Sequence, residues 1–144
     1  MALKRGGYLH DLGKVSIPDK ILRKETVLSA DEWVTMREHP VIGEKICQPL
    51  RSLKNVLPII RSHHEHWNGS GYPDALKGPQ IPLLARVLQV VDVYDALTTS
   101  RPYKPALPHE DAERTMQEET RARLWDPEIV SEFLSMLRGR RVAA

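Results

Sequence analysis

The longest apolar run in the chain, residues 83–97, constrains its fold more than any other segment. Its valines would suit a β-strand, but its length and its alanine and leucine content favour a buried helix. Pro82 comes just before the run, and the sequence Ser-Arg-Pro-Tyr-Lys-Pro at residues 100–105 ends it. We therefore expect one long buried helix here, against which the rest of the chain packs.

Shorter segments with helical patterns accompany this run. Ser29 and Glu32 have the spacing of a capping box, in which the Ser caps a helix and the Glu reaches back to it. The first ten residues are expected to form the end of a helix, and further helices are expected at residues 20–23, 30–39, 40–50, 57–66, 109–123 and 127–137, with fraying from Gly139 and a loop at residues 68–78. The sequence thus predicts an all-α protein, a helical bundle with long functional loops.

Composition limits the classes of protein that fit. With 144 residues and 41% hydrophobic content, the chain has the size of one domain with a single core. The formal net charge of +2 argues against a nucleic-acid polymer as partner. Cys47 is the single cysteine, which excludes an intramolecular disulfide and favours a reducing compartment, so we expect a cytoplasmic protein. No apolar run approaches the ~20 residues that a membrane span needs, and we see no secretory signal.

The stretch from His63 to Pro73 carries the strongest chemical signal. It places His63, His64, Glu65 and His66 in succession, followed by a turn of small residues that ends in Tyr72. Buried imidazoles need hydrogen-bond partners, so two adjacent histidines are an unusual way to build a core. Neutral imidazole is instead a common metal ligand. We interpret His63 and His64 as metal ligands and His66 as a surface residue.

Two further histidines and a carboxylate fit the same interpretation. On a helix, the neighbours His10 and Asp11 point about 100° apart, so they can embrace one ion or bridge two. The alternative is a solvated His beside a helix-end Asp. His39, just before Pro40, fits either a ligand or a helix cap.

Asp92 is the most informative carboxylate, because it lies inside the apolar run. An unpaired buried carboxylate costs several kcal/mol, so Asp92 requires a cation or hydrogen-bond donors. Asp95 lies one turn further, on nearly the same face, and requires the same explanation. An ion pair with Arg86 or Arg101 is the alternative to a metal.

Basic residues complete the pattern. Lys14 follows the His-Asp pair by one turn, and Arg101 and Lys104 flank Pro-Tyr. Arg suits phosphate through its two-pronged guanidinium and Lys as a point charge. Histidines, shared carboxylates and nearby cations together suit metal-assisted hydrolysis of a phosphodiester. The alternative for the cations is a solvated surface.

Several motifs stand in one order along nearly the whole chain. They are Leu-His-Asp-Leu-Gly-Lys at 9–14, Ile-Pro-Asp at 17–19, His-Pro at 39–40 with Gly43, His-His-Glu at 63–65 through Gly-Tyr-Pro at 71–73, Ile-Pro-Leu at 81–83 with Ala-Arg at 85–86, Asp-Val-Tyr-Asp-Ala-Leu-Thr at 92–98, and Arg-Pro-Tyr-Lys at 101–104. In this combination the chain resembles the HD-GYP family, a branch of the HD-domain phosphohydrolases.

The resemblance implies an HD-domain-like helical bundle with two or three divalent metal ions, iron or manganese first among them. It implies hydrolysis of the bacterial second messenger cyclic di-GMP to linear pGpG and, in some members, to GMP. Asp11 would bridge two ions and Lys14 would lie beside the scissile phosphate. Carried over by position, the metal ligands would be His10, Asp11, His39, His63, His64 and Asp92, and the substrate-binding residues Tyr72, Asp95, Arg101 and Lys104. Implied partners are GGDEF-type or receiver-domain proteins, as in two-component signalling, and a second copy of the chain.

One departure from the family is large. The family places a further His ligand, and often a Glu, upstream of the His-Asp pair, and this sequence has no counterpart. We therefore interpret residues 1–144 as a single HD-GYP-like domain, truncated at its N-terminus. Two alternatives follow: a catalytically impaired signalling module that acts through protein–protein contacts of its Gly-Tyr-Pro loop, or an HD-type phosphohydrolase for another nucleotide.

Overall fold

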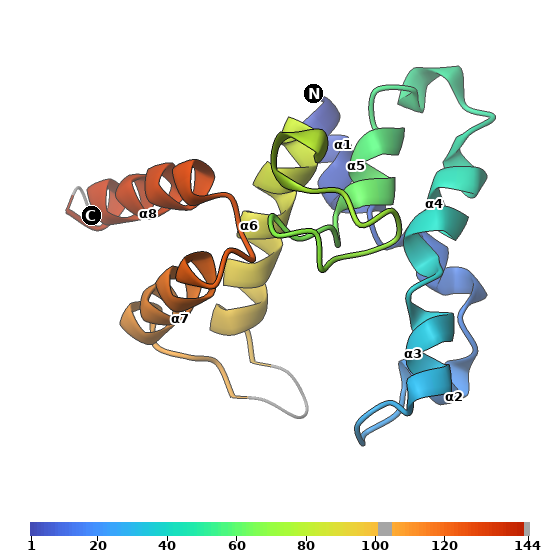
Figure 1. Cartoon of the computed structure of the whole chain (residues 1–144), viewed down its shortest axis with the longest axis horizontal. Helices are drawn as coiled ribbons and strands as arrows, with labels where there is room; N and C mark the ends of the chain where they lie inside the picture. The colour runs from blue at the N-terminus through green and yellow to red at the C-terminus, as the bar shows by residue number, and fades with distance from the viewer. Residues whose placement is uncertain (101–104, 143–144) are drawn as a thin grey trace.

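All regular structure in the described part of the chain is helical. The computed structural model describes residues 1–100 and 105–142. The α-helices are α1 (Ala2–Leu9), α2 (Asp19–Leu22), α3 (Ala30–Met36), α4 (His39–Cys47), α5 (Leu57–Ser62), α6 (Leu83–Thr98), α7 (His109–Arg121) and α8 (Pro127–Val142). Short 3-10 helices lie between some of them: η1 (Leu12–Ser16), η2 (Arg51–Leu53) and η3 (Gly78–Gln80). The prediction of an all-α fold is confirmed (Figure 1).

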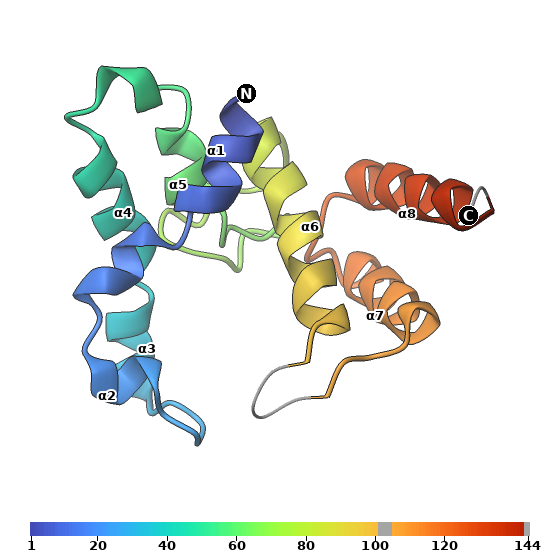
Figure 2. The same cartoon turned by 180° about the vertical axis from the view of Figure 1, so that it is seen from behind.

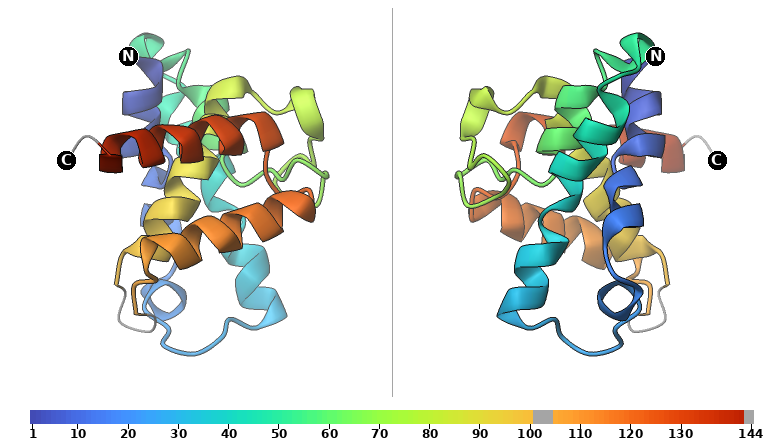
Figure 3. Two further views of the ribbon diagram at one scale, coloured as in Figure 1. Left: turned by 90° about the vertical axis from the view of Figure 1, so that its left-hand side faces the viewer. Right: turned by 90° about the vertical axis from the view of Figure 1, so that its right-hand side faces the viewer.

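The central element of the fold is α6, the predicted long helix. It lies between α1 and α5 on one side and α7 and α8 on the other (Figures 1 and 2). The larger core joins α6, α7 and α8 and includes Val90, Leu97, Met116, Val130 and Leu134. A smaller core, formed where α4 meets α5, contains Cys47, Val56 and Ile60. The α2–α3 segment projects at one end of the molecule (Figure 3). The apolar residues of α6 are buried against helices on both of its sides, which explains why the valine-rich run is a helix.

The predicted helix starts are present within one residue, but several ends differ from the prediction: α3 and α4 each end three residues early, at Met36 and Cys47. The Ser29 hydroxyl accepts from the Glu32 amide while the Glu32 carboxylate accepts from the Ser29 amide, as the capping box requires. The last helix reaches Val142 instead of ending near Leu137. Its extension has a partner, because Arg138 forms an ion pair of 2.9 Å with Glu113 of α7.

The fifth helix ends earlier than predicted, at Ser62 instead of His66. The carbonyl of His64 accepts a hydrogen bond from the Tyr72 amide, and the carbonyl of Glu65 accepts one from the Gln89 side chain. These long-range contacts replace the next helical turn, which a sequence pattern cannot show. His63 and His64 therefore lie on a turn that follows α5.

Close packing of η1 against α4 depends on Gly13. A Cβ atom on Gly13 would overlap with the backbone carbonyl of His39 and would approach the Gly43 nitrogen to 2.6 Å. The missing side chain thus lets the His-Asp segment lie directly beside the start of α4. Among the described residues, no helix combines the length and the apolar character needed to cross a bilayer.

Candidate metal centre

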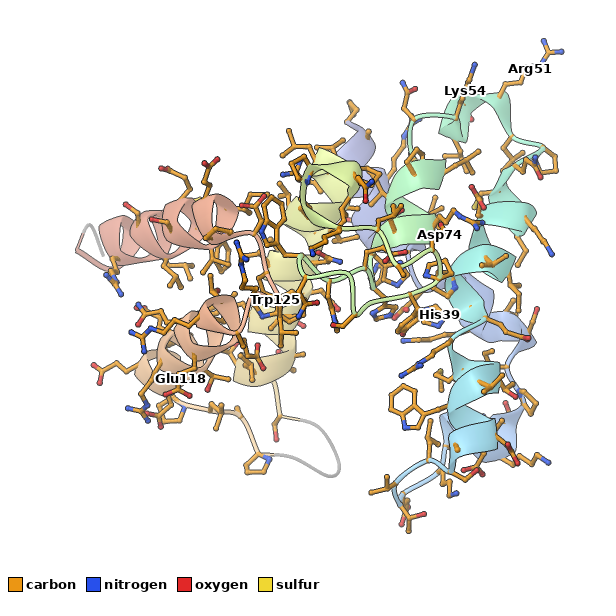
Figure 4. The ribbon with its side chains drawn as sticks, viewed as in Figure 1. His39, Arg51, Lys54, Asp74, Glu118 and Trp125 are labelled. Carbon is orange, nitrogen blue, oxygen red and sulfur yellow. The ribbon has the colours of Figure 1, made fainter. Side chains whose placement is uncertain are left out.

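Segments far apart in the sequence deliver the predicted ligands to one region. His10 follows the last residue of α1, and Asp11 precedes η1. His39 is the first residue of α4, and His63 and His64 follow α5. Figure 4 shows His39 at the start of α4, in the same region as the labelled Asp74 of the loop. The packing of η1 and α5 on α4 brings these segments together.

Asp11, His39, His63 and His64 form a compact cluster. Each offers one ligand atom, and these atoms lie within 4.8 Å of one another. The Nε2 atoms of His39 and His63 are 3.2 Å apart. The Oδ1 atom of Asp11 lies 3.4 Å from the first and 3.8 Å from the second. Nitrogen and carboxylate ligands at such spacing fit a divalent metal ion.

Backbone contacts fix the tautomers of the histidines. In each of three rings the Nδ1 atom lies 2.7–2.8 Å from a carbonyl oxygen three residues earlier: His10 with Gly7, His39 with Met36 and His63 with Ile60. A carbonyl can only accept, so Nδ1 carries the proton and donates. This leaves Nε2, the atom that faces the cluster, as the nitrogen able to bind a metal ion. Protein metal sites commonly orient their histidines in this way.

Burial keeps the imidazoles of His63 and His64 neutral. It lowers the pKa of His63 to about 3 and, together with the neighbouring His63, lowers the pKa of His64 to about 2. The Nε2 atom of the neutral His63 ring carries a lone pair, and it lies 3.2 Å from the Nε2 atom of His39. The buried Oδ1 atom of Asp11 has no hydrogen-bond partner among the described residues. Unmatched electron-pair donors that converge in this way fit a bound cation.

Asp11 is well suited to hold such a cation. Burial raises its pKa, but the contact with His39 and the hydrogen bond from Lys14 outweigh this effect and hold the pKa well below its usual range. The Lys14 ammonium lies 2.7 Å from Oδ2, whereas Oδ1 faces the histidines. The side chain therefore remains a carboxylate with one oxygen toward the cluster.

The predicted burial of Asp92 is wrong. Its side chain is 42% exposed, because it lies at the edge of α6 near the end of α1, where the Oδ1 atom is 3.9 Å from the Nε2 of His10. His10 in turn lies 3.5 Å from Oδ2 of Asp11 and packs edge-on against His63. His10 and Asp92 thus border the compact cluster and extend it toward α6.

The sequence left open an ion pair of Asp92 or Asp95 with Arg86 or Arg101, and the structure excludes Arg86 as the partner. Arg86 binds Asp126 at 2.7 Å instead of Asp92 or Asp95. Asp95 is exposed and accepts a hydrogen bond from Thr99. Arg101 and Lys104, predicted to bind substrate, lie outside the described residues.

Tyr72 covers one side of the cluster. Its ring stacks on His64 with centroids 4.8 Å apart, and it meets the His39 ring edge-on at 6.5 Å. Burial raises the pKa of Tyr72 to about 12, so its hydroxyl keeps its proton at neutral pH. The predicted surface residue His66 is half-buried; it contacts Trp125 and Ser70 instead of the cluster.

Glu65 is the residue whose role the sequence did not reveal. It is fully buried, and its carboxylate accepts hydrogen bonds from the Asp74 and Leu76 amides at 2.7 and 2.9 Å. Arg61 holds the same loop through two hydrogen bonds of 2.7 Å to the Asp74 carboxylate. These contacts anchor the loop that carries Tyr72. The only hint in the sequence was a charged residue directly after the two candidate ligands.

The fold and the cluster define a helical domain built around a candidate metal centre. A family model described as "HD domain" matches residues 1–129, and the chain belongs to this HD domain family. The family recognised from the sequence motifs is thereby confirmed.

Known relatives agree with this assignment. A protein of Thermotoga maritima named "Cyclic di-GMP phosphodiesterase" is 41% identical over 130 residues, which cover 89% of this chain and 35% of that protein. A Vibrio cholerae protein named "3'3'-cGAMP-specific phosphodiesterase 2" is 37% identical over 136 residues, covering 92% of this chain and 26% of that protein. The chain thus spans about a third or less of the length of these relatives.

A solved structure supports the fold. The structure titled "Bd1817, a HDG"Y"P protein from Bdellovibrio bacteriovorus" superimposes with a TM-score of 0.72 at 22% identity. The match covers 95% of this chain and 43% of that one. At this identity the likeness shows a shared helical architecture.

Proposed function

We propose that this chain is the catalytic part of a metal-dependent phosphodiesterase that hydrolyses cyclic di-GMP to linear pGpG, and onward to GMP. The observation that carries the proposal is the convergence of the Nε2 atoms of His39 and His63 and the unpartnered Oδ1 of Asp11 on one small region. The relative from T. maritima, named for this reaction, supports the choice of substrate.

In this proposal the cluster and the two residues that border it form the metal site. His10, Asp11, His39, His63, His64 and Asp92 would hold two or three divalent ions, with iron or manganese as the first candidates. Such ions activate water at neutral pH and stabilise the negative charge that develops on a phosphate. Asp11 stays ionised because of its depressed pKa, and its position between two histidines suits a bridging carboxylate.

Substrate contacts come from residues around the cluster. Lys14 is 37% exposed and lies beside Asp11, so its ammonium can also bind a phosphate oxygen. Tyr72 limits the space above His64 and thereby orients a nucleotide whose phosphate is at the cluster. Arg101, Lys104 and Asp95 complete the proposed substrate site.

The experiment is hydrolysis of cyclic di-GMP by the purified chain with Mn²⁺ or Fe²⁺, followed by chromatography. We expect linear pGpG from the wild type, and its loss in Asp11→Asn and on addition of a chelator. Exposed His109→Asn is the matched control and should keep activity. A metal-loaded, folded wild type without turnover would overturn the proposal and favour the signalling module.

A second candidate substrate has a specific observation behind it. The V. cholerae relative is named for 3'3'-cGAMP, a cyclic dinucleotide with one adenine. Turnover of 3'3'-cGAMP but not of cyclic di-GMP in the same assay would favour this alternative.

A further inference from the structure

A groove beside the candidate metal centre has no role in the proposal so far. It measures about 470 Å³ and lies between α3, α4 and the Tyr72 loop. Its lining includes Val34, Arg37, Glu38, Val41, Tyr72 and Pro73. This volume falls in the range of small-molecule sites and accommodates a nucleobase.

The groove and the metal cluster share a wall. Tyr72 lines the groove and stacks on His64 of the cluster. Arg37 and Glu38 line the groove and directly precede His39 in the chain. A nucleotide whose phosphate lies at the cluster therefore has the groove within reach of its base.

Arg37 is held in place without neutralising its charge. Its Cζ atom lies 5.4 Å from the ring centre of Tyr72 and 5.8 Å from that of Trp33, distances typical of cation–π contacts. Among residues 1–100 and 105–142, no carboxylate forms an ion pair with Arg37, whereas Arg61 and Arg86 each bind one. Its exposed guanidinium is thus available to a ligand.

Glu38 offers the complementary group. It is exposed, and in the part of the chain that the structure describes its carboxylate has no ion-pair partner. The groove therefore combines a two-pronged donor, a carboxylate acceptor and the apolar side chains of Val34 and Val41. Guanine has the matching pattern: O6 and N7 accept on one edge, and N1–H and N2–H₂ donate on the next. Adenine presents a donor in place of O6 and has no N1–H.

We propose that this groove is a guanine-recognition subsite, in which Arg37 donates to O6 and N7 and Glu38 accepts from N1–H and N2–H₂. The inference rests on the proposed function, because it assigns the groove to one base of the cyclic dinucleotide. It names the residues that make the site select guanine over adenine, and it fits substrates with either one or two guanines.

The test compares binding of GMP and AMP to the metal-free chain by NMR titration, so that no turnover is needed. A well-placed bidentate contact discriminates bases by about tenfold or more, so the wild type should prefer GMP by that factor. Arg37→Lys keeps the positive charge but loses the bidentate guanidinium, and Glu38→Gln loses the carboxylate that accepts from N1–H and N2–H₂. Both variants should reduce the preference to about twofold or less.

Arg51→Lys is the matched control, since Arg51 is exposed on η2 and lies far from His39 in Figure 4. It should keep the preference for GMP. Circular dichroism of each variant verifies folding. Equal affinity of the wild type for GMP and AMP, or an unchanged preference in Arg37→Lys and Glu38→Gln, would overturn the subsite. The separate turnover assay with cyclic di-GMP decides the proposed function, so the two failures are distinguishable.

Discussion

Replacement of Glu65 by Gln tests whether this buried carboxylate holds the Tyr72 loop over the cluster. Its oxygens each accept one backbone N–H, from Asp74 at 2.7 Å and from Leu76 at 2.9 Å. Gln keeps a single acceptor oxygen, and its amide group cannot accept the second N–H. The change therefore leaves one part-buried backbone N–H without its acceptor while the side chain keeps nearly the same shape.

The expected cost follows from these contacts. A hydrogen bond to a charged group contributes about 1.5–3 kcal/mol, so the loss of one such part-buried bond should cost about 1–3 kcal/mol. For a domain of this size, each kcal/mol lowers the melting temperature by about 2–4 °C. The Gln89 side chain binds the backbone carbonyl of Glu65 and not its carboxylate, so this contact remains in the variant. The loss should therefore be concentrated in the loop at residues 66–78.

Amide hydrogen exchange measures this local effect directly. In Glu65→Gln, the amides of Asp74 and Leu76 should exchange about tenfold faster for each 1.4 kcal/mol by which loop opening becomes easier. Glu118→Gln, an exposed residue of α7 that Figure 4 labels, is the control with the same chemical change. An unchanged melting temperature together with unchanged exchange of both amides would refute the reasoning.

Two further predictions concern the cluster itself. Gly13→Ala should lower the melting temperature and weaken Mn²⁺ binding, because its Cβ would overlap with the His39 carbonyl; wild-type values of both would contradict this packing. Acid should destabilise the metal-free protein: below the ordinary pKa of 6.5 the unfolded chain protonates His63 and His64, whereas the folded protein does so only near pH 3 and pH 2. Stability should thus fall as the pH drops from 6.5 toward 3, with a lower melting temperature at pH 5 than at pH 7. His64→Asn should reduce this drop and exposed His109→Asn should not; a drop of equal size in His64→Asn would contradict the assignment.

The sequence predicted the elements whose cause is local. The helix at residues 83–97 follows from its length and apolar content, and the cap at Ser29 follows from the spacing to Glu32. The candidate ligands were also recognisable, because adjacent histidines require an explanation wherever they lie. The structure brings Asp11, His39, His63 and His64 into one cluster.

Features with a non-local cause could not be read from the sequence. The early end of α5 depends on Gln89, which binds the Glu65 carbonyl from another helix. The exposure of Asp92 depends on how α1 meets α6, so an apolar sequence context gave the wrong burial. The anchoring role of Glu65 depends on a loop about ten residues further along the chain.

Titration of the metal-free chain with Mn²⁺, with the free ion followed by electron paramagnetic resonance, tests the central claim most directly. The claim is that Asp11, His39, His63 and His64 together hold a divalent cation. We predict that the wild type and His109→Asn bind at least one ion per chain, and that Asp11→Asn and His63→Gln lose most of this binding while they remain folded. Wild-type affinity for Mn²⁺ in folded Asp11→Asn and His63→Gln would contradict the account.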